Sequence, residues 1–136
     1  MQRARLVSLA LIALAILGSV TPAYAVSTKG IVRNVHYVAA FFPSNSFSYP
    51  YSGELVLTFN NGIVSGWYND YSVKPGGPLD GRSKAVVTGG LSGTHVMLSI
   101  GGVLSLSGTI EGGMIEGTAT ARGAVYQFFA EQRRSH

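Results

Sequence analysis

Glycine-bearing turn signals recur along the chain, and they constrain the fold more than any other feature of the sequence. Two stretches, FNNGIVSGW at 59–67 and IEGGMIEGT at 110–118, share one plan. Each has an apolar residue, turn formers that end in glycine, two apolar residues, a polar residue, a second glycine and a strand former. Glycine reaches the positive φ of two-residue hairpin turns at little steric cost. The repetition therefore predicts a series of consecutive β-hairpins.

Between the turns, apolar and polar residues alternate with the period of a β-strand and never settle into a helical period. The pattern predicts eight short strands. They cover approximately residues 31–42, 53–60, 63–72, 84–89, 93–100, 103–110, 114–121 and 124–131. Tight hairpins make neighbours in sequence neighbours in space, so we expect an all-β fold with an antiparallel up-and-down meander.

Such a meander has two edge strands that would pair with other chains unless they are closed or covered. Closure into a small β-barrel removes both edges and leaves room inside for side chains or one small ligand. A two-sheet β-sandwich is the alternative. A transmembrane barrel is disfavoured, because the outer face expected for 93–121 carries Ser, Thr, His and Glu instead of a uniformly apolar band.

The turns also predict the register. A two-residue turn at 112–113 places Ile110 opposite Ile115 and gathers apolar residues on one face, with polar residues on the other. A three-residue loop at 101–103 and a turn at 122–123 extend the same apolar face to the neighbouring strands. We expect this face to be the core.

The turn at Asn61-Gly62 leaves two placements for Trp67. A two-residue turn puts Trp67 on the outer face beside Val56, together with Ile63 and Tyr71. A three-residue loop sends the tryptophan into the core instead. The similarity of the two stretches favours the outer placement, whereas the general burial of tryptophan favours the core.

Residues 1–25 have the features of a secretory signal peptide. Arg3 and Arg5 precede an apolar run at 6–17, and Ala23-Tyr24-Ala25 matches a cleavage site. Cleavage after Ala25 leaves one domain at 26–136, whose polar tail at 132–136 is expected to fray. We therefore expect a secreted or periplasmic protein without an integral membrane segment.

The composition offers little chemistry. The chain has no cysteine, which excludes disulfides, thiol catalysis and zinc–thiolate sites. No stripe of Lys and Arg is present, so nucleic acid is not expected as a partner. His36 and His95 lie on different predicted strands, and Glu111 and Glu116 fall on the polar face beside a turn. We expect no enzymatic activity, no cofactor and no metal site.

Two long connections at the same end of the meander are the candidate site. The segments 43–52 and 74–83 are longer than their strands require, which is common for functional loops. They would rim the mouth of a barrel and bind a small apolar or aromatic molecule there, or merely cap the barrel end. The candidate ligand-binding residues are Phe47, Tyr49, Tyr51, Lys74, Asp80 and Arg82.

Two other functions stay open. The protein could be a self-associating surface or structural protein, so an oligomer is one outcome. An apolar outer patch would then carry the contact, formed by Val56, Ile63, Trp67 and Tyr71. The protein could instead bind another protein through its loops, in the manner of an enzyme inhibitor.

The stretch Gly66-Trp67-Tyr68-Asn69 resembles the Gly-x-Trp-x-Asn motif of the avidin family, whose members are also eight-stranded meanders. The resemblance would make Asn69 a ligand contact. The likeness covers only this stretch, lies on the third predicted strand instead of the first, and lacks the residue between Gly and Trp. The chain has one tryptophan where that family uses several, so we do not assign it to the family.

We expect the exported protein to begin at Val26, because Ala23 and Ala25 supply the small side chains of a cleavage site. Intact-mass measurement on protein recovered from the periplasm or medium of a bacterial host checks this. Ala25→Asp should leave the chain uncleaved. A wild-type mass that still contained residues 1–25 after export would contradict the prediction.

Overall fold

The computed structural model describes residues 30–44, 50–71 and 77–133. The predicted signal peptide therefore lies outside the described residues, as does the end of the tail. Gln132 still belongs to the last strand, and the Arg133 N–H donates a hydrogen bond to the His36 carbonyl, at 2.8 Å. The expected fraying of the tail stays a prediction, and residues 134–136 lie outside the described residues.

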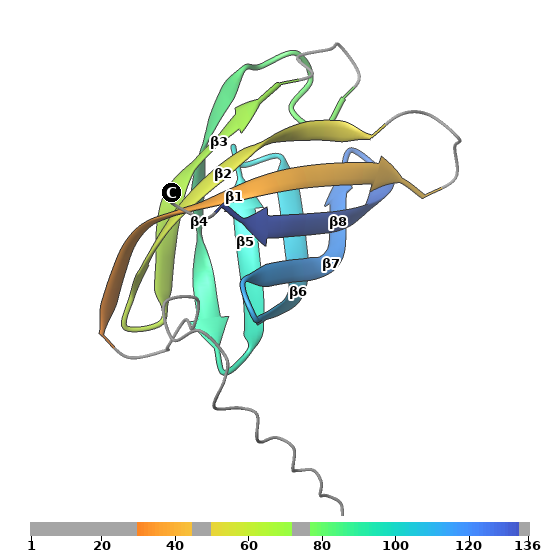
Figure 1. Ribbon diagram of the computed structural model, residues 1–136. Helices are drawn as coiled ribbons and strands as arrows, with labels where there is room; N and C mark the ends of the chain where they lie inside the picture. The colour runs from red at the N-terminus through yellow and green to blue at the C-terminus, as the bar shows by residue number, and fades with distance from the viewer. Residues whose placement is uncertain (1–29, 45–49, 72–76, 134–136) are drawn as a thin grey trace, which may run out of the picture.

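The described residues form eight strands, as the turn pattern predicts. They are β1 (Ile31–Pro43), β2 (Tyr51–Asn60), β3 (Ile63–Asp70), β4 (Lys84–Ser92), β5 (His95–Ile100), β6 (Leu104–Glu111), β7 (Met114–Ala121) and β8 (Ala124–Gln132). Each strand pairs with the next in an antiparallel manner, and β8 pairs with β1 (Figure 1). The result is a closed barrel in meander order, so the predicted β-barrel is confirmed and the sandwich alternative is wrong.

The hairpin turns have the geometry that their residues favour. At Asn61-Gly62 the two φ angles are 51° and 88°, and at Arg122-Gly123 they are 49° and 81°. Two successive positive φ angles define the mirror-image turn whose twist matches that of the flanking strands. The predicted register is confirmed, since Ile110 lies opposite Ile115. The Asn61-Gly62 turn also places Trp67 opposite Val56 on the outer face, so the core placement of Trp67 is wrong.

The last glycine of each of the two similar stretches, Gly66 or Gly117, has a separate role. A Cβ at Gly66 would meet the carbonyl oxygen of Val56, and a Cβ at Gly117 would meet that of Ser107. Backbones on neighbouring strands therefore approach too closely at these points for any side chain. Glycine in a strand interior permits this approach and the strong bending of a small barrel. The two stretches are alike because both combine a tight turn with such a close approach of two backbones.

Aromatic rings fill much of the barrel interior. Phe41 packs edge-on against Tyr68 at 5.6 Å and against Tyr126 at 6.0 Å, and it lies 4.8 Å from Phe128, between ring centroids. All four side chains are buried. Because they come from β1, β3 and β8, the cluster ties together strands that are far apart in the sequence.

The described end of the β3–β4 connection, residues 77–83, packs against one end of the barrel. Leu79 is fully buried and belongs to the core cluster, and Gly77 beside it is buried too. The Arg122 guanidinium donates a hydrogen bond to the Gly77 carbonyl at 2.8 Å, which fastens the connection to the β7–β8 turn. This part of the connection therefore packs as a plug in the barrel end.

Gly117→Ala should destabilise the protein by about 1–3 kcal/mol, because the new Cβ has no room against the neighbouring backbone. Gly112→Asn is the matched control. A Cβ at Gly112 meets nothing within 4 Å, and Asn tolerates its positive φ, so a change of no more than about 0.5 kcal/mol is expected. Urea unfolding measures both variants. Equal stability of Gly117→Ala and the wild type would contradict the close approach of the two backbones at Gly117.

Candidate functional site

The candidate loop residues separate into different environments. Phe47, Tyr49 and Lys74 lie outside the described residues. Tyr51 is half-buried and packs edge-on against Tyr126, with the ring centroids 6.1 Å apart. Asp80 and Arg82 are exposed. Tyr51 thus contacts the interior.

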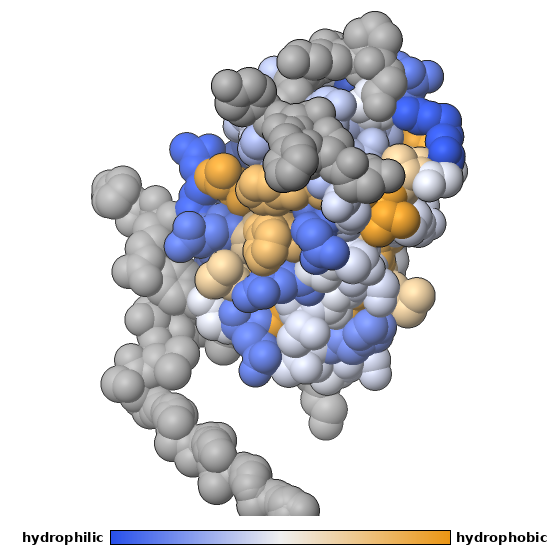
Figure 2. All heavy atoms as spheres, turned by 90° about the vertical axis from the view of Figure 1, so that its right-hand side faces the viewer, coloured by the Kyte–Doolittle hydropathy of each residue, from blue (hydrophilic) through white to orange (hydrophobic). Residues whose placement is uncertain are grey.

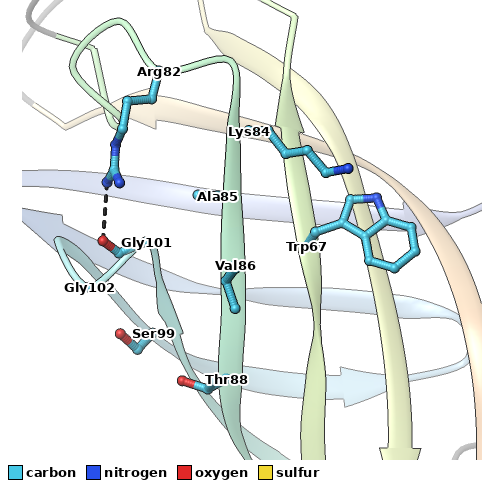
Figure 3. A pocket seen from close by; sticks show the side chains of 9 residues that line it. All are labelled: Trp67, Arg82, Lys84, Ala85, Val86, Thr88, Ser99, Gly101 and Gly102. Carbon is cyan, nitrogen blue, oxygen red and sulfur yellow. Dashed lines mark hydrogen bonds between the residues drawn. The ribbon is translucent and has the colours of Figure 1, made fainter.

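A groove of about 480 Å³ lies on the outer flank of β3, β4 and β5, next to the plugged end. We call it the basic groove and define it by six of its residues. They are Trp67, Arg82, Lys84, Val86, Thr88 and Ser99 (Figure 3). Of the three predicted ligand-binding residues that the structure describes, Arg82 lines it, whereas Tyr51 and Asp80 do not. Sequence reasoning missed the groove, although it had placed Trp67 and Arg82 in candidate sets.

The groove exists because β4 extends beyond β5. The first residues of β4 pair with β3, but β5 ends at Ile100 opposite Val87. Beyond that point the Gly101 N–H donates to the Val86 carbonyl at 2.8 Å. Gly101 and Gly102 then bring no side chains to the surface. The hollow is therefore left where the start of β4 has no partner in β5 and where the two neighbouring glycines have no side chains.

The charged and aromatic groups of the basic groove are in contact. The Lys84 ammonium lies over the Trp67 ring, 5.3 Å from its centroid. This cation–π contact is worth about 0.5–1 kcal/mol at an exposed position. The Arg82 guanidinium donates a hydrogen bond to the Gly101 carbonyl at 3.1 Å across the groove (Figure 3). Neither cation forms a salt bridge that joins it to another described residue in this region. The groove therefore presents positive charge beside an aromatic surface.

The outer patch predicted along β3 is not continuous. Val56 is on the outer face but only 1% exposed, so it contributes no accessible surface, and its place in the patch is corrected. Ile63 and Tyr71 are well exposed, but Ile63 begins β3 and Tyr71 directly follows its last residue, with Trp67 between them. Burial of Val56 opposite the large Trp67 side chain could not be read from strand alternation alone.

A second surface was not found from the sequence. On the outer side of β1, β7 and β8, a hollow of about 390 Å³ is lined mainly by apolar side chains. The rings of Phe42 and Phe129 meet edge-on with centroids 5.7 Å apart. Val38 is 51% exposed and Met114 39%. Figure 2 shows apolar side chains at the surface among hydrophilic ones. The runs VAAFF and FFA were the available signal, but only the β1–β8 pairing joins them.

Glu54 holds β1, β2 and the chain end together. Its carboxylate is 2.9 Å from His36 Nδ1 and accepts a hydrogen bond from Arg133 at 3.0 Å. The hydrogen bond to His36, followed by that to Arg133, lowers the pKa of Glu54 despite partial burial. The cluster is a structural clamp outside the groove. The described residues contain no group of three or more His, Asp or Glu side chains suited to a metal ion.

Two tyrosine hydroxyls are buried in the barrel. Among the described residues, neither Tyr37 nor Tyr68 has a hydrogen-bond partner for its hydroxyl. Burial raises the pKa of both well above the ordinary value of 10, and the nearby Asp70 raises that of Tyr68 further. Both phenols therefore stay neutral under ordinary conditions.

No protein-family model matches the chain, and no curated protein matches it. Within the described residues, no helix has the length and apolar character needed to cross a membrane. The candidate binding sites are therefore the two outer hollows and the barrel interior.

We expect stability to fall as the pH rises above about 10, because Tyr37 and Tyr68 stay neutral in the fold but ionise when unfolded. The stabilising difference is fully present below that pH. Urea midpoints measured from neutral to alkaline pH should fall less steeply for Tyr37→Phe and Tyr68→Phe than for the wild type.

Both Phe variants should also match or exceed wild-type stability near pH 7, because each removes an unpaired buried hydroxyl. Tyr71→Phe is the control at an exposed side chain. An alkaline slope that is unchanged in both Phe variants would contradict the assignment.

Proposed function

We propose that the protein is an exported, non-enzymatic binding protein whose site is the basic groove. Its ligand joins an anionic group to a flat apolar or aromatic group. The observation that supports this most directly is the Lys84 ammonium over Trp67, with Arg82 lining the same hollow. The predicted signal peptide supports export.

The groove is a better site than the barrel interior. Phe41 and its aromatic neighbours occupy the interior, and Leu79 packs into the end where a ligand would enter. The ligand is therefore placed outside the barrel, on the flank of the connection that carries Arg82. This keeps the apolar or aromatic part of the predicted ligand, adds an anionic group to it, and moves its site from the mouth to the outer surface.

The groove suits recognition more than catalysis. The Lys and Arg donors attract an anion and form charge-assisted hydrogen bonds with it, while Trp67 and Val86 offer apolar contact. Thr88 and Ser99 add hydroxyls. No histidine or carboxylate lines the groove, so its described residues include no general base to activate either hydroxyl.

Naphthalene-2-carboxylate should bind the groove of the purified protein. Trp67 is the single tryptophan, so its indole N–H resonance in a ¹⁵N–¹H NMR spectrum reports directly on the site. We expect this resonance to shift in a saturable way. Lys84→Gln should weaken binding about tenfold, equivalent to about 1.4 kcal/mol, through loss of a charged contact.

Two controls define the result. Naphthalene-2-methanol lacks the carboxylate and should bind more weakly. Arg33→Gln removes a positive charge from an exposed position outside the groove and should leave the affinity unchanged. An indole resonance that does not respond to the carboxylate, or equal weakening by Arg33→Gln, would count against this function.

A further inference from the structure

The acidic residues are distributed unevenly over the outside of the barrel. Three of the six acidic residues, Glu111, Glu116 and Glu131, lie at exposed positions on β6, β7 and β8. None of the three forms a salt bridge with a described residue. Strands β5 to β8 contain no Lys or Arg. Two arginines border these strands, but Arg133 pairs with Glu54 and Arg122 donates to the Gly77 carbonyl. The outward side chains of β6, β7 and β8 themselves therefore carry negative charge.

The same side carries the exposed apolar hollow. Glu131 lies opposite Val38 on β1 and opposite Met114 on β7, and Glu116 lies opposite Phe129. Carboxylates thus alternate with apolar side chains on one continuous surface. We call it the acidic apolar face and define it by six residues. They are Val38, Phe42, Met114, Glu116, Phe129 and Glu131.

The basic groove has the complementary composition. It combines the positive charges of Arg82 and Lys84 with Trp67 and with Val86, which is 69% exposed. In the closed order β1 to β8, β4 and β8 stand half-way round the barrel from each other. One molecule therefore presents opposite charges, each beside exposed apolar groups, on opposite sides.

Barrel closure restricts how two copies can meet. Every strand is paired with a neighbour on each side over at least part of its length, so the barrel has no complete edge strand for association by strand addition. We therefore look to the outward side chains for contact. The acidic apolar face has what the groove recognises under the proposed function, namely carboxylates next to flat apolar groups such as Phe129.

We infer that the partner of the basic groove is the acidic apolar face of a second copy of this chain. This inference rests on the proposed function, because it takes the groove as the recognition site. Burial of the exposed apolar groups supplies the attraction, and opposite charges set the orientation. Since the two surfaces differ, the contact is heterologous, and each copy keeps one unused face for the next.

Sedimentation velocity on the purified protein at low ionic strength tests the inference. The average sedimentation coefficient should rise with protein concentration and fall again at high salt, which shortens the range of charge interactions. Lys84→Glu and Glu131→Lys should each weaken association about tenfold or more, because like charges then face each other. The double variant K84E/E131K should regain it. Arg33→Glu, at an exposed site outside both faces, should associate like the wild type.

Each outcome of this experiment either supports or overturns the inference. Loss of association in both single variants with recovery in the double variant supports the inference. A wild type that stays monomeric throughout overturns it, as does association that survives both single reversals or is not restored in the double variant. Matching melting temperatures show that the variants fold. If the Trp67 resonance responds to naphthalene-2-carboxylate while the protein stays monomeric, the groove function stands and only the second-copy partner is wrong.

Discussion

The pairing of β8 with β1 is the interaction on which the rest of the structure depends. It runs from Tyr37 opposite Gln132 to Pro43 opposite Tyr126, and it converts a meander of hairpins into a barrel. The chain has no cysteine, so the closed apolar interior must stabilise the fold without disulfides. Closure brings Phe41 against rings from β3 and β8. It also removes both sheet edges and leaves the outer side chains as the means of contact with other molecules.

The two candidate surfaces follow from how this barrel is closed. The basic groove is present because β4 has nine residues and β5 six, so the start of β4 has no strand partner on one side. Two glycines then keep the hollow open. The acidic apolar face arises at the closing pair, where β1 and β8 place Val38, Phe42 and Phe129 side by side. A chain of hairpins without closure would have neither the filled interior nor this second face.

Much of the fold could be predicted because its determinants are local. Gly112-Gly113 fixes the register of β6 and β7 through turn geometry, whereas the sequence left two turn lengths open at Asn61-Gly62. The candidate site was harder to predict from the sequence. Arg82 was identified from loop length and charge, but its partners Lys84 and Val86 are strand residues with an ordinary alternating pattern. Leu79 is buried because its connection packs into the barrel end, and Val56 is buried opposite the large Trp67 side chain. Alternation within one strand carries no information about such contacts.

By itself, the sequence determined the all-β class, the order of the strands and the registers across the tight hairpins at 112–113 and 122–123, but it left the placement of Trp67 open. These follow from glycine φ and from a period of two residues, which act over a few bonds. Only the tertiary structure decided the closing register, the plug formed by Leu79 and the separation of charge between opposite sides. These depend on contacts between residues far apart in the chain, where no turn limits the possible pairings and only the packing of the whole core selects one.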